Sequence, residues 1–226
     1  MLRFWFAPLL VLTMLAPLPV AVQAQEKTHS QFEGFYTDLG FGYRNINTST
    51  SSVLTLNGSV IPSSISSGGS SHQVAVLTTG YNFNVTEKYF LGIGANISPA
   101  SGLMQQIQIQ ALNQKVTVSG VKPLYNYGFF LSPGFQTEDG LFYLKAGKQT
   151  QVINSNTGPS ANGYLLGLGY KQFVYESIYL FGEANYSFYD SQTTSRTIIS
   201  SGRTINASIT TSTQGTRLLL GLGYQF

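Results

Sequence analysis

The sequence has 226 residues, of which 9% are charged and 13% aromatic, with twelve basic and nine acidic side chains. Soluble domains have about 25% charged residues, so this chain carries too few charges to cover a soluble surface. The small net charge argues against a nucleic-acid-binding protein, and the absence of cysteine excludes disulfides, thiolate chemistry and cysteine metal sites.

The first 24 residues predict a cleaved secretory signal peptide. An uncharged run follows Arg3 and ends in small or medium side chains at Ala24. A transmembrane helix is the alternative, but prolines within the run would break it and no basic stop-transfer flank follows. We therefore expect a signal peptide at 1–24, a periplasmic leader at 25–32 and one domain at 33–226.

The remaining chain has the composition of a transmembrane β-barrel. No apolar run near 20 residues follows the signal peptide, which excludes helical membrane spans. A secreted, charge-poor, aromatic-rich chain without a spanning helix is typical of proteins that cross the bilayer with strands.

Alternation of apolar with small or polar side chains predicts eight strands. In the first, Phe35, Leu39 and Phe41 occupy one face and Asp38 and Arg44 the other. The second strand is ambiguous in its first half, where valines break the alternation. The predicted strands are Glu33–Arg44, about Gln73–Asn84, Tyr89–Ile97, about Val118–Pro133, Leu141–Thr150, a sixth from Tyr164, a seventh from Ile178, and Thr216–Phe226.

Short turns and long polar loops alternate between these strands, as in outer-membrane barrels with short periplasmic turns and longer extracellular loops. The short turns are predicted at 84–88, 137–140 and 175–177. Long loops are predicted at 45–71, 98–114, 151–162 and 191–214, and the second should contain a hairpin above the membrane. A ten-stranded barrel would make that hairpin span, which would bring its glutamines into lipid. We therefore predict an all-β fold, an eight-stranded antiparallel up-and-down transmembrane barrel.

The polar faces of the predicted strands carry six charges: Asp38, Arg44, Lys145, Lys171, Glu183 and Arg217. In a soluble sandwich, the alternative fold, these would lie on the wet exterior. Glycine and asparagine dominate the same faces, and small side chains suit the crowded lumen of a narrow barrel. Because unpaired charges in a dry lumen cost several kcal/mol, we predict a lumen charge network of Asp38, Arg44, Lys145, Glu183 and Arg217. The network would fill the barrel; a gated ion path is the alternative.

The predicted loops are mildly basic. Lys115, Arg196 and Arg203 are candidate contacts for lipopolysaccharide phosphates, sulfated glycans or an acidic host surface, although scattered cations are often only solvated.

The pattern resembles the small outer-membrane barrel superfamily that includes the OmpA membrane domain, OmpX and the opacity proteins. The likeness is carried by eight short amphipathic strands, the segment Leu180–Tyr186 around Glu183, and the terminal Phe226. It implies a Gram-negative outer membrane with its lipid and lipopolysaccharide as surroundings. It also implies that Leu220, Leu222, Tyr224 and Phe226 form the signal read by the barrel-assembly machinery.

Catalysis is a weaker hypothesis. Barrel enzymes that act on lipids use a histidine with a nearby serine, and the only histidines here are His29, in the leader, and His72, in a serine-rich stretch where a neighbouring serine has little meaning. Two isolated histidines also argue against a metal site. We expect no catalytic residues, cofactor or metal.

Three functions remain open. The first is a surface interaction barrel of the adhesin or resistance type, whose Ser/Thr-rich loops bind a partner that the sequence does not identify. The second is a narrow porin for small solutes or ions, and the third is a lipid-modifying enzyme.

Overall fold

The computed structural model describes residues 31–56, 59–61, 64–66, 69–99, 106–111, 114–119, 123–138, 140–153, 160–200 and 203–226. The predicted signal peptide, most of the leader and His29 lie outside these residues. None of the described residues belongs to a helix with the length and apolar character of a membrane span.

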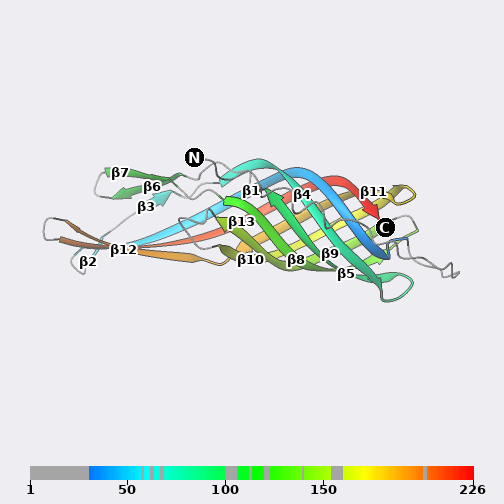
Figure 1. Ribbon diagram of the computed structural model, residues 1–226. Coiled ribbons are helices and arrows are strands. Elements are labelled where there is room, and N and C mark those ends of the chain that lie inside the picture. Colours follow the sequence, from blue (N-terminus) through cyan, green and yellow to red (C-terminus); the bar gives the residue numbers. More distant parts are fainter. Residues whose placement is uncertain are drawn as a thin grey trace, which may run out of the picture.

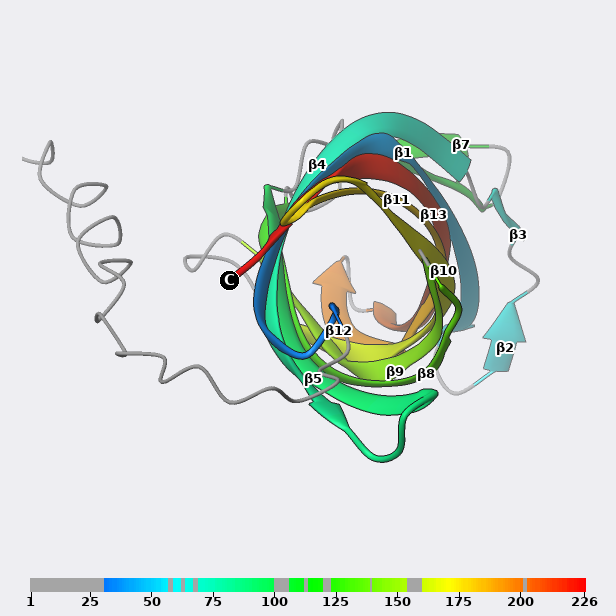
Figure 2. The same cartoon turned by 90° about the vertical axis from the view of Figure 1, so that its right-hand side faces the viewer.

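Eight strands form a closed antiparallel barrel (Figures 1 and 2). Around the ring they are β13 (Arg203–Gln225), β11 (Ile178–Tyr189), β10 (Ala161–Tyr175), β9 (Gly140–Ile153), β8 (Pro123–Gln136), β5 (Tyr89–Pro99), β4 (Gly69–Asn84) and β1 (Gly34–Leu56). Pairing of β1 with β13 closes the ring. The predicted eight-stranded up-and-down barrel is confirmed.

The strands are staggered around the ring. Following directly opposed residues once around the barrel leads from Val74 on β4 to Asn84 on the same strand, a shift of ten residues, through Gly42, Leu219, Glu183, Gly169, Tyr143, Gly134 and Phe90. In a barrel of this strand number, such a stagger goes with a strand tilt of about 40°. An interior of this width is just large enough for side chains to fill.

Side chains alternate between the two faces of the wall. In β13, Leu218 and Leu220 are 64% and 74% exposed, whereas Leu219 between them is 4% exposed. Leucines of equal hydrophobicity thus take opposite sides because of strand geometry alone. The outward positions of the eight strands form a continuous apolar belt of Leu, Ile, Phe and Tyr, as lipid-facing surfaces require. The valines that made β4 ambiguous, Val74 and Val76, face inward and are buried.

Large aromatic side chains fill the lumen by lying over glycines of the neighbouring strand. Six inward rings each sit directly opposite a glycine: the pairs are Tyr36–Gly80, Phe90–Gly134, Phe130–Gly94, Tyr143–Gly169, Tyr179–Gly223 and Phe181–Gly221. A Cβ atom on Gly80 would lie 2.6 Å from the Tyr36 hydroxyl, so the space that glycine leaves is the space that the ring occupies. The polar face is therefore less polar than the sequence suggested.

Three short turns lie at one end of the barrel, called here the short-turn end. They join β4 to β5, β8 to β9 and β10 to β11, at the predicted places. Thr137 and Gly140 close the second turn through a backbone hydrogen bond of 2.8 Å, and Glu176 in the third takes a positive φ of 34°.

Phe32 covers the lumen at the short-turn end. Its side chain is 1% exposed and packs against the rings of Phe173 and Tyr179, at centroid distances of 4.4 and 6.1 Å. Asn82 donates a hydrogen bond to the Phe32 carbonyl. The last residue of the predicted leader therefore belongs to the barrel core.

The opposite end, the long-loop end, is more ordered into strands than the sequence predicted. The prediction of a long loop at 45–71 is wrong, because β1 continues to Leu56 and is followed by the short strands β2 (Ser59–Ile61) and β3 (Ser64–Ser66). The prediction of a long loop at 191–214 is also wrong, because β12 (Gln192–Ser200) forms a hairpin with the first half of β13. Threonine is a good strand former, but strands with water on both faces show no apolar period to reveal them.

The β-hairpin expected between the third and fourth barrel strands is present. It consists of β6 (Gln106–Ala111) and β7 (Gln114–Ser119), and with β3 it makes a separate three-stranded sheet at the long-loop end (Figure 1). The predicted start of the fourth barrel strand at Val118 is wrong, since Val118 pairs with Ile107 in this hairpin and β8 begins at Pro123.

Candidate functional site

The charged side chains of the predicted polar face all lie in the lumen. Asp38, Arg44, Lys145, Lys171, Glu183 and Arg217 are 3% to 7% exposed and come from β1, β9, β10, β11 and β13. Strand parity directs them inward, and their positions along the strands set their height. Asp38 and Lys171 lie nearest the short-turn end, Lys145 and Glu183 follow, and the arginines lie toward the long-loop end.

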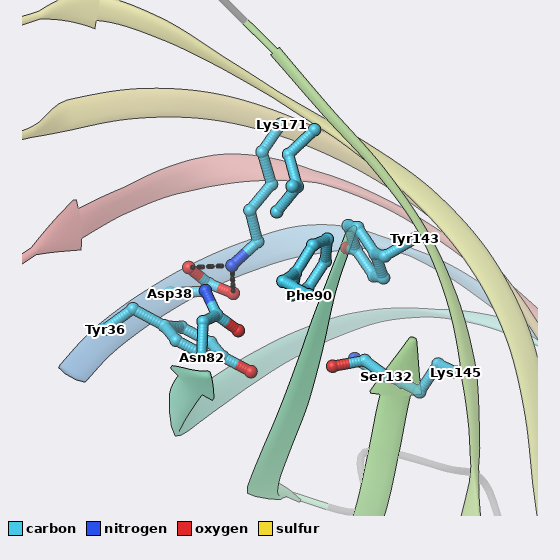
Figure 3. A pocket seen from close by; sticks show the side chains of 9 residues that line it. Tyr36, Asp38, Asn82, Phe90, Ser132, Tyr143, Lys145 and Lys171 are labelled. Atoms are coloured by element: carbon cyan, nitrogen blue, oxygen red, sulfur yellow. Dashed lines mark hydrogen bonds and ion pairs between the residues drawn. The ribbon is translucent and has the colours of Figure 1, made fainter. Parts of the chain in front are cut away.

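The ion pair nearest the short-turn end joins Asp38 and Lys171 across the lumen (Figure 3). Lys171 Nζ lies 3.1 Å from Asp38 Oδ2 and 3.4 Å from Oδ1. The Tyr179 hydroxyl accepts a 2.9 Å hydrogen bond from the same ammonium and donates one to Asp38 Oδ1. Three strands are thus tied together by one buried carboxylate.

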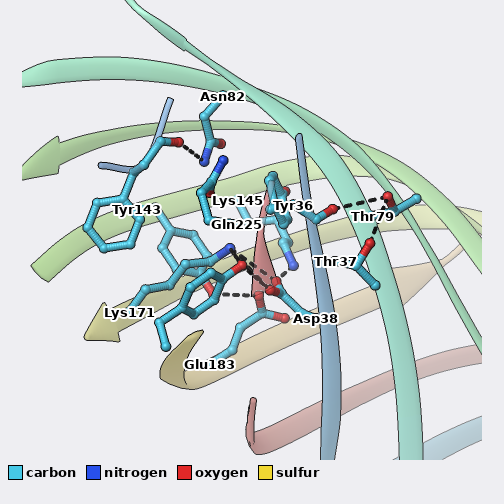
Figure 4. A network of polar contacts seen from close by, with 12 residues as sticks. Tyr36, Thr37, Asp38, Thr79, Asn82, Tyr143, Lys145, Lys171, Glu183 and Gln225 are labelled. Carbon is cyan, nitrogen blue, oxygen red and sulfur yellow. Dashed lines mark hydrogen bonds and ion pairs between the residues drawn. The ribbon is translucent and has the colours of Figure 1, made fainter. Parts of the chain in front are cut away.

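The second ion pair joins Glu183 and Lys145 (Figure 4). Lys145 Nζ donates to Glu183 Oε2 at 2.5 Å, and the Tyr143 hydroxyl donates to the same oxygen at 2.9 Å. Asn185 Nδ2 donates to Oε1 at 2.7 Å. Both oxygens of the carboxylate therefore have donors, which is what a buried charge needs.

Aromatic rings complete the surroundings of the two ammonium groups. Lys171 Nζ lies 3.7 Å from the centroid of the Tyr36 ring, and Lys145 Nζ lies 4.2 Å from that of Phe130. Such cation–π contacts are worth about 2 kcal/mol when desolvated. Beside the pairs remains a cavity of about 10 Å³, roughly the room of one water molecule, which Tyr36, Asp38 and Lys171 help to line (Figure 3).

The two arginines have different surroundings. Arg44 Nη2 donates a 2.8 Å hydrogen bond to the Tyr189 hydroxyl. Arg217 interacts electrostatically with Glu183, but its buried Nε and Nη2 have no hydrogen-bond partner in the described part of the chain. Neither arginine has a carboxylate within ion-pair distance among the described residues.

The sequence-based network named five residues. In the structure, two of them, Lys145 and Glu183, pair with each other, Asp38 pairs with a sixth residue, and Arg44 and Arg217 lie side by side. Lys171 was recognised on the polar face but was left out of the network, although it is the partner of Asp38. The sequence analysis also did not predict that Tyr143 and Tyr179 donate hydrogen bonds to the buried carboxylates. Parity gives the direction of a side chain, whereas the partner depends on the register and the shape of the lumen, which a single sequence does not reveal.

The terminal residues predicted as an assembly signal face outward. Phe226 closes the wall through a 2.9 Å hydrogen bond from its backbone nitrogen to the Phe35 carbonyl, and its ring lies 4.9 Å from that of Tyr224. Leu220 and Leu222 belong to the apolar belt. Their role in assembly remains a prediction.

The candidate loop cations and His72 complete the predicted set. Lys115, Arg196 and Arg203 belong by backbone to β7, β12 and β13, but their side chains lie outside the described residues. His72 pairs across strands with Arg44, and its buried Nδ1 has no hydrogen-bond partner in the described ranges. In that part of the chain, no cluster of three or more His, Asp or Glu could hold a metal.

No family model and no curated protein sequence matches the chain. Among solved structures, the outer membrane protein OprG from Pseudomonas aeruginosa is similar, with 15% identity, a TM-score of 0.51, and coverage of 86% of this chain and 96% of OprG. Neisserial surface protein A is similar with 12% identity and a TM-score of 0.48, over 86% of this chain and 98% of that protein. Ail of Yersinia pestis is similar with 14% identity and a TM-score of 0.36, over 86% of this chain and 99% of Ail. The similarity to OprG, together with the closed ring of eight antiparallel strands, shows that the chain has the fold of the small eight-stranded outer-membrane β-barrels.

Proposed function

We propose that the protein is an outer-membrane surface protein of a Gram-negative bacterium, of the adhesin or resistance type. In this proposal the barrel is an anchor with a filled lumen, and the long-loop end binds a partner. The observation that carries it is the contrast between the two parts: buried ion pairs occupy the lumen, while β1 and β13 stay paired well beyond the apolar belt.

The surface offered to a partner is the sheet that β12, β13 and β1 form above the belt, called here the hydroxyl sheet. Cross-strand hydroxyl pairs line it, such as Thr193–Thr210 at 2.9 Å and Ser191–Ser212 at 2.7 Å. Further along, Thr197 donates to Asn206 at 2.7 Å. A paired sheet holds these groups in fixed positions, which lowers the entropy cost of binding compared with mobile loops.

Deletion of the hydroxyl sheet tests the proposal. Removing Thr48–Ser70 and Thr193–Thr211 leaves the belt residues and the lumen pairs in place, so heat-modifiable mobility on gels should show a folded, inserted barrel. Adherence to host cells or survival in serum of a bacterium that expresses the variant should be lost. Unchanged adherence and survival with a correctly inserted variant would contradict the proposal.

A matched variant separates sheet shape from hydroxyl chemistry. Replacing Thr193 and Thr210 by valine keeps the β-branched shape and removes one hydroxyl pair. If the hydroxyls make the contact, this double variant should bind the partner more weakly than the parent while inserting equally well.

A further inference from the structure

The lumen holds more positive than negative charge. Among the described residues its buried charges are two carboxylates and four cations. Asp38 is paired with Lys171 and Glu183 with Lys145, each at salt-bridge distance. Arg44 and Arg217 are the two cations in excess.

These two arginines lie directly opposite each other on neighbouring strands. Arg44 on β1 is the register partner of Arg217 on β13, and both are 4% exposed. His72 on β4 continues the same row on the other side of Arg44. Like charges at directly opposed positions destabilise a sheet, and a guanidinium cannot lose its proton to relieve the repulsion.

The nitrogen atoms of Arg217 that lack hydrogen-bond partners indicate which kind of acceptor would fit beside them. Its Nε and Nη2 are buried without a hydrogen-bond partner in the described part of the chain. These two nitrogens form one edge of the guanidinium, and their N–H bonds run parallel, which matches two oxygens of one oxyanion. Water could accept the hydrogen bonds, but it would leave the excess charge in place.

We propose that this row of arginines is a binding site for a small oxyanion with phosphate-like, sulfate-like or carboxylate chemistry. Arg217 would hold two of its oxygens through Nε and Nη2, and Arg44 would supply the second positive charge while it keeps its bond to Tyr189. The ion would enter from the long-loop end, because Phe32 and the Asp38–Lys171 pair fill the other end. Because both arginines are buried inside the barrel wall, the proposal assigns the site to a free solute and not to a lipid headgroup.

The experiment is a titration of the folded barrel, in zwitterionic detergent at low ionic strength, with inorganic phosphate, sulfate and chloride. Nitrogen-15 NMR of the arginine Nε–H groups and the thermal unfolding midpoint are the readouts. We expect a saturable shift of the Arg217 signal with phosphate and sulfate, a rise in the midpoint, and at least tenfold weaker binding of chloride.

Three variants make the result specific. Arg217→Met should weaken phosphate binding at least tenfold. His72→Asp keeps both arginines but places a carboxylate beside Arg44, so it should also weaken phosphate about tenfold. Lys148→Met, which removes an exposed cation on the outward face, should change nothing.

Absence of a saturable shift in the parent protein would overturn the proposal, and so would chloride binding as tightly as phosphate. Parental affinity in Arg217→Met would do the same. Should Arg217→Met fail to fold, His72→Asp decides, because unchanged phosphate affinity in that variant contradicts a site governed by the arginine row.

Discussion

At the scale of single residues, each of the two buried carboxylates of the lumen accepts hydrogen bonds from several donors. Asp38 accepts from Lys171 and from Tyr179, and Glu183 accepts from Lys145, Tyr143 and Asn185. Removing one partner of a buried ion pair is costly because the other charge stays behind, whereas removing both is often nearly neutral. The pairs should therefore show strong energetic coupling.

Lys171→Met should lower the free energy of unfolding by about 3–5 kcal/mol, because Asp38 would be left buried without its cation. Adding Asp38→Asn should recover most of the loss. Urea unfolding in lipid vesicles measures both, with Lys148→Met as the control for loss of a lysine on the outward face. A single variant as stable as this control would show that the pair contributes little.

The close packing of aromatic rings against glycines leads to a second prediction. A Cβ on Gly223 would run into the Tyr179 ring and Asp38 Oδ1, whereas a Cβ on Gly182, which faces outward, would meet only Leu220 Cδ2 at 3.4 Å. Gly223→Ala should cost about 1–3 kcal/mol, typical of overpacking, and Gly182→Ala should be close to neutral. Equal unfolding midpoints for the two variants would contradict the glycine–aromatic packing.

At the scale of strands, periodicity predicted the barrel elements well and the extensions poorly. A strand between lipid and lumen must alternate, so Leu166 and Leu168 reveal β10 from the sequence alone. The upper half of β13 has water on both faces, and residues such as Thr210 and Thr211 carry no face preference for a pattern to detect. Their strand character depends on pairing with β1 and β12, which no local pattern encodes.

The lipid-facing role of the outward positions predicts a large penalty for a charge there. Leu144 and Leu168 are cross-strand partners and are 62% and 61% exposed. Arginine at either position should destabilise the folded barrel by about 2–4 kcal/mol if the site lies near the bilayer midplane. Val85→Arg, in a short turn outside the belt, should cost much less in the same vesicle unfolding assay. A similar cost at both places would contradict the position of the belt.

At the scale of the whole molecule, a stagger of ten residues over eight strands leaves a lumen that rings and ion pairs can fill. The sequence predicted which charges face inward, but it did not show that Tyr36, Tyr143 and Tyr179 would occupy the space above glycines. That filling depends on which residues face each other around the closed ring. The filled lumen makes the narrow-porin hypothesis weaker than the proposed function as a surface interaction protein.

The filled lumen predicts little ion flow. Planar-bilayer recordings of the purified, folded protein at neutral pH should show no steady openings. A control variant combines Gln149→Ala with Ser187→Ala, which removes a 3.0 Å hydrogen bond inside the lumen but leaves both ion pairs, and it should stay closed as well. Steady conductance in the parent protein would favour the narrow-porin function instead.

The central claim is that alternate side chains face lipid while the charges lie inside, and the absence of cysteine allows a direct measurement. Single cysteines at Leu218, Leu219 and Leu220, labelled with a nitroxide in lipid vesicles, report contact with dissolved oxygen, which concentrates in acyl chains. We predict strong oxygen relaxation at Leu218 and Leu220 and weak relaxation at Leu219. Equal relaxation at the three positions, or the inverse pattern, would contradict the account.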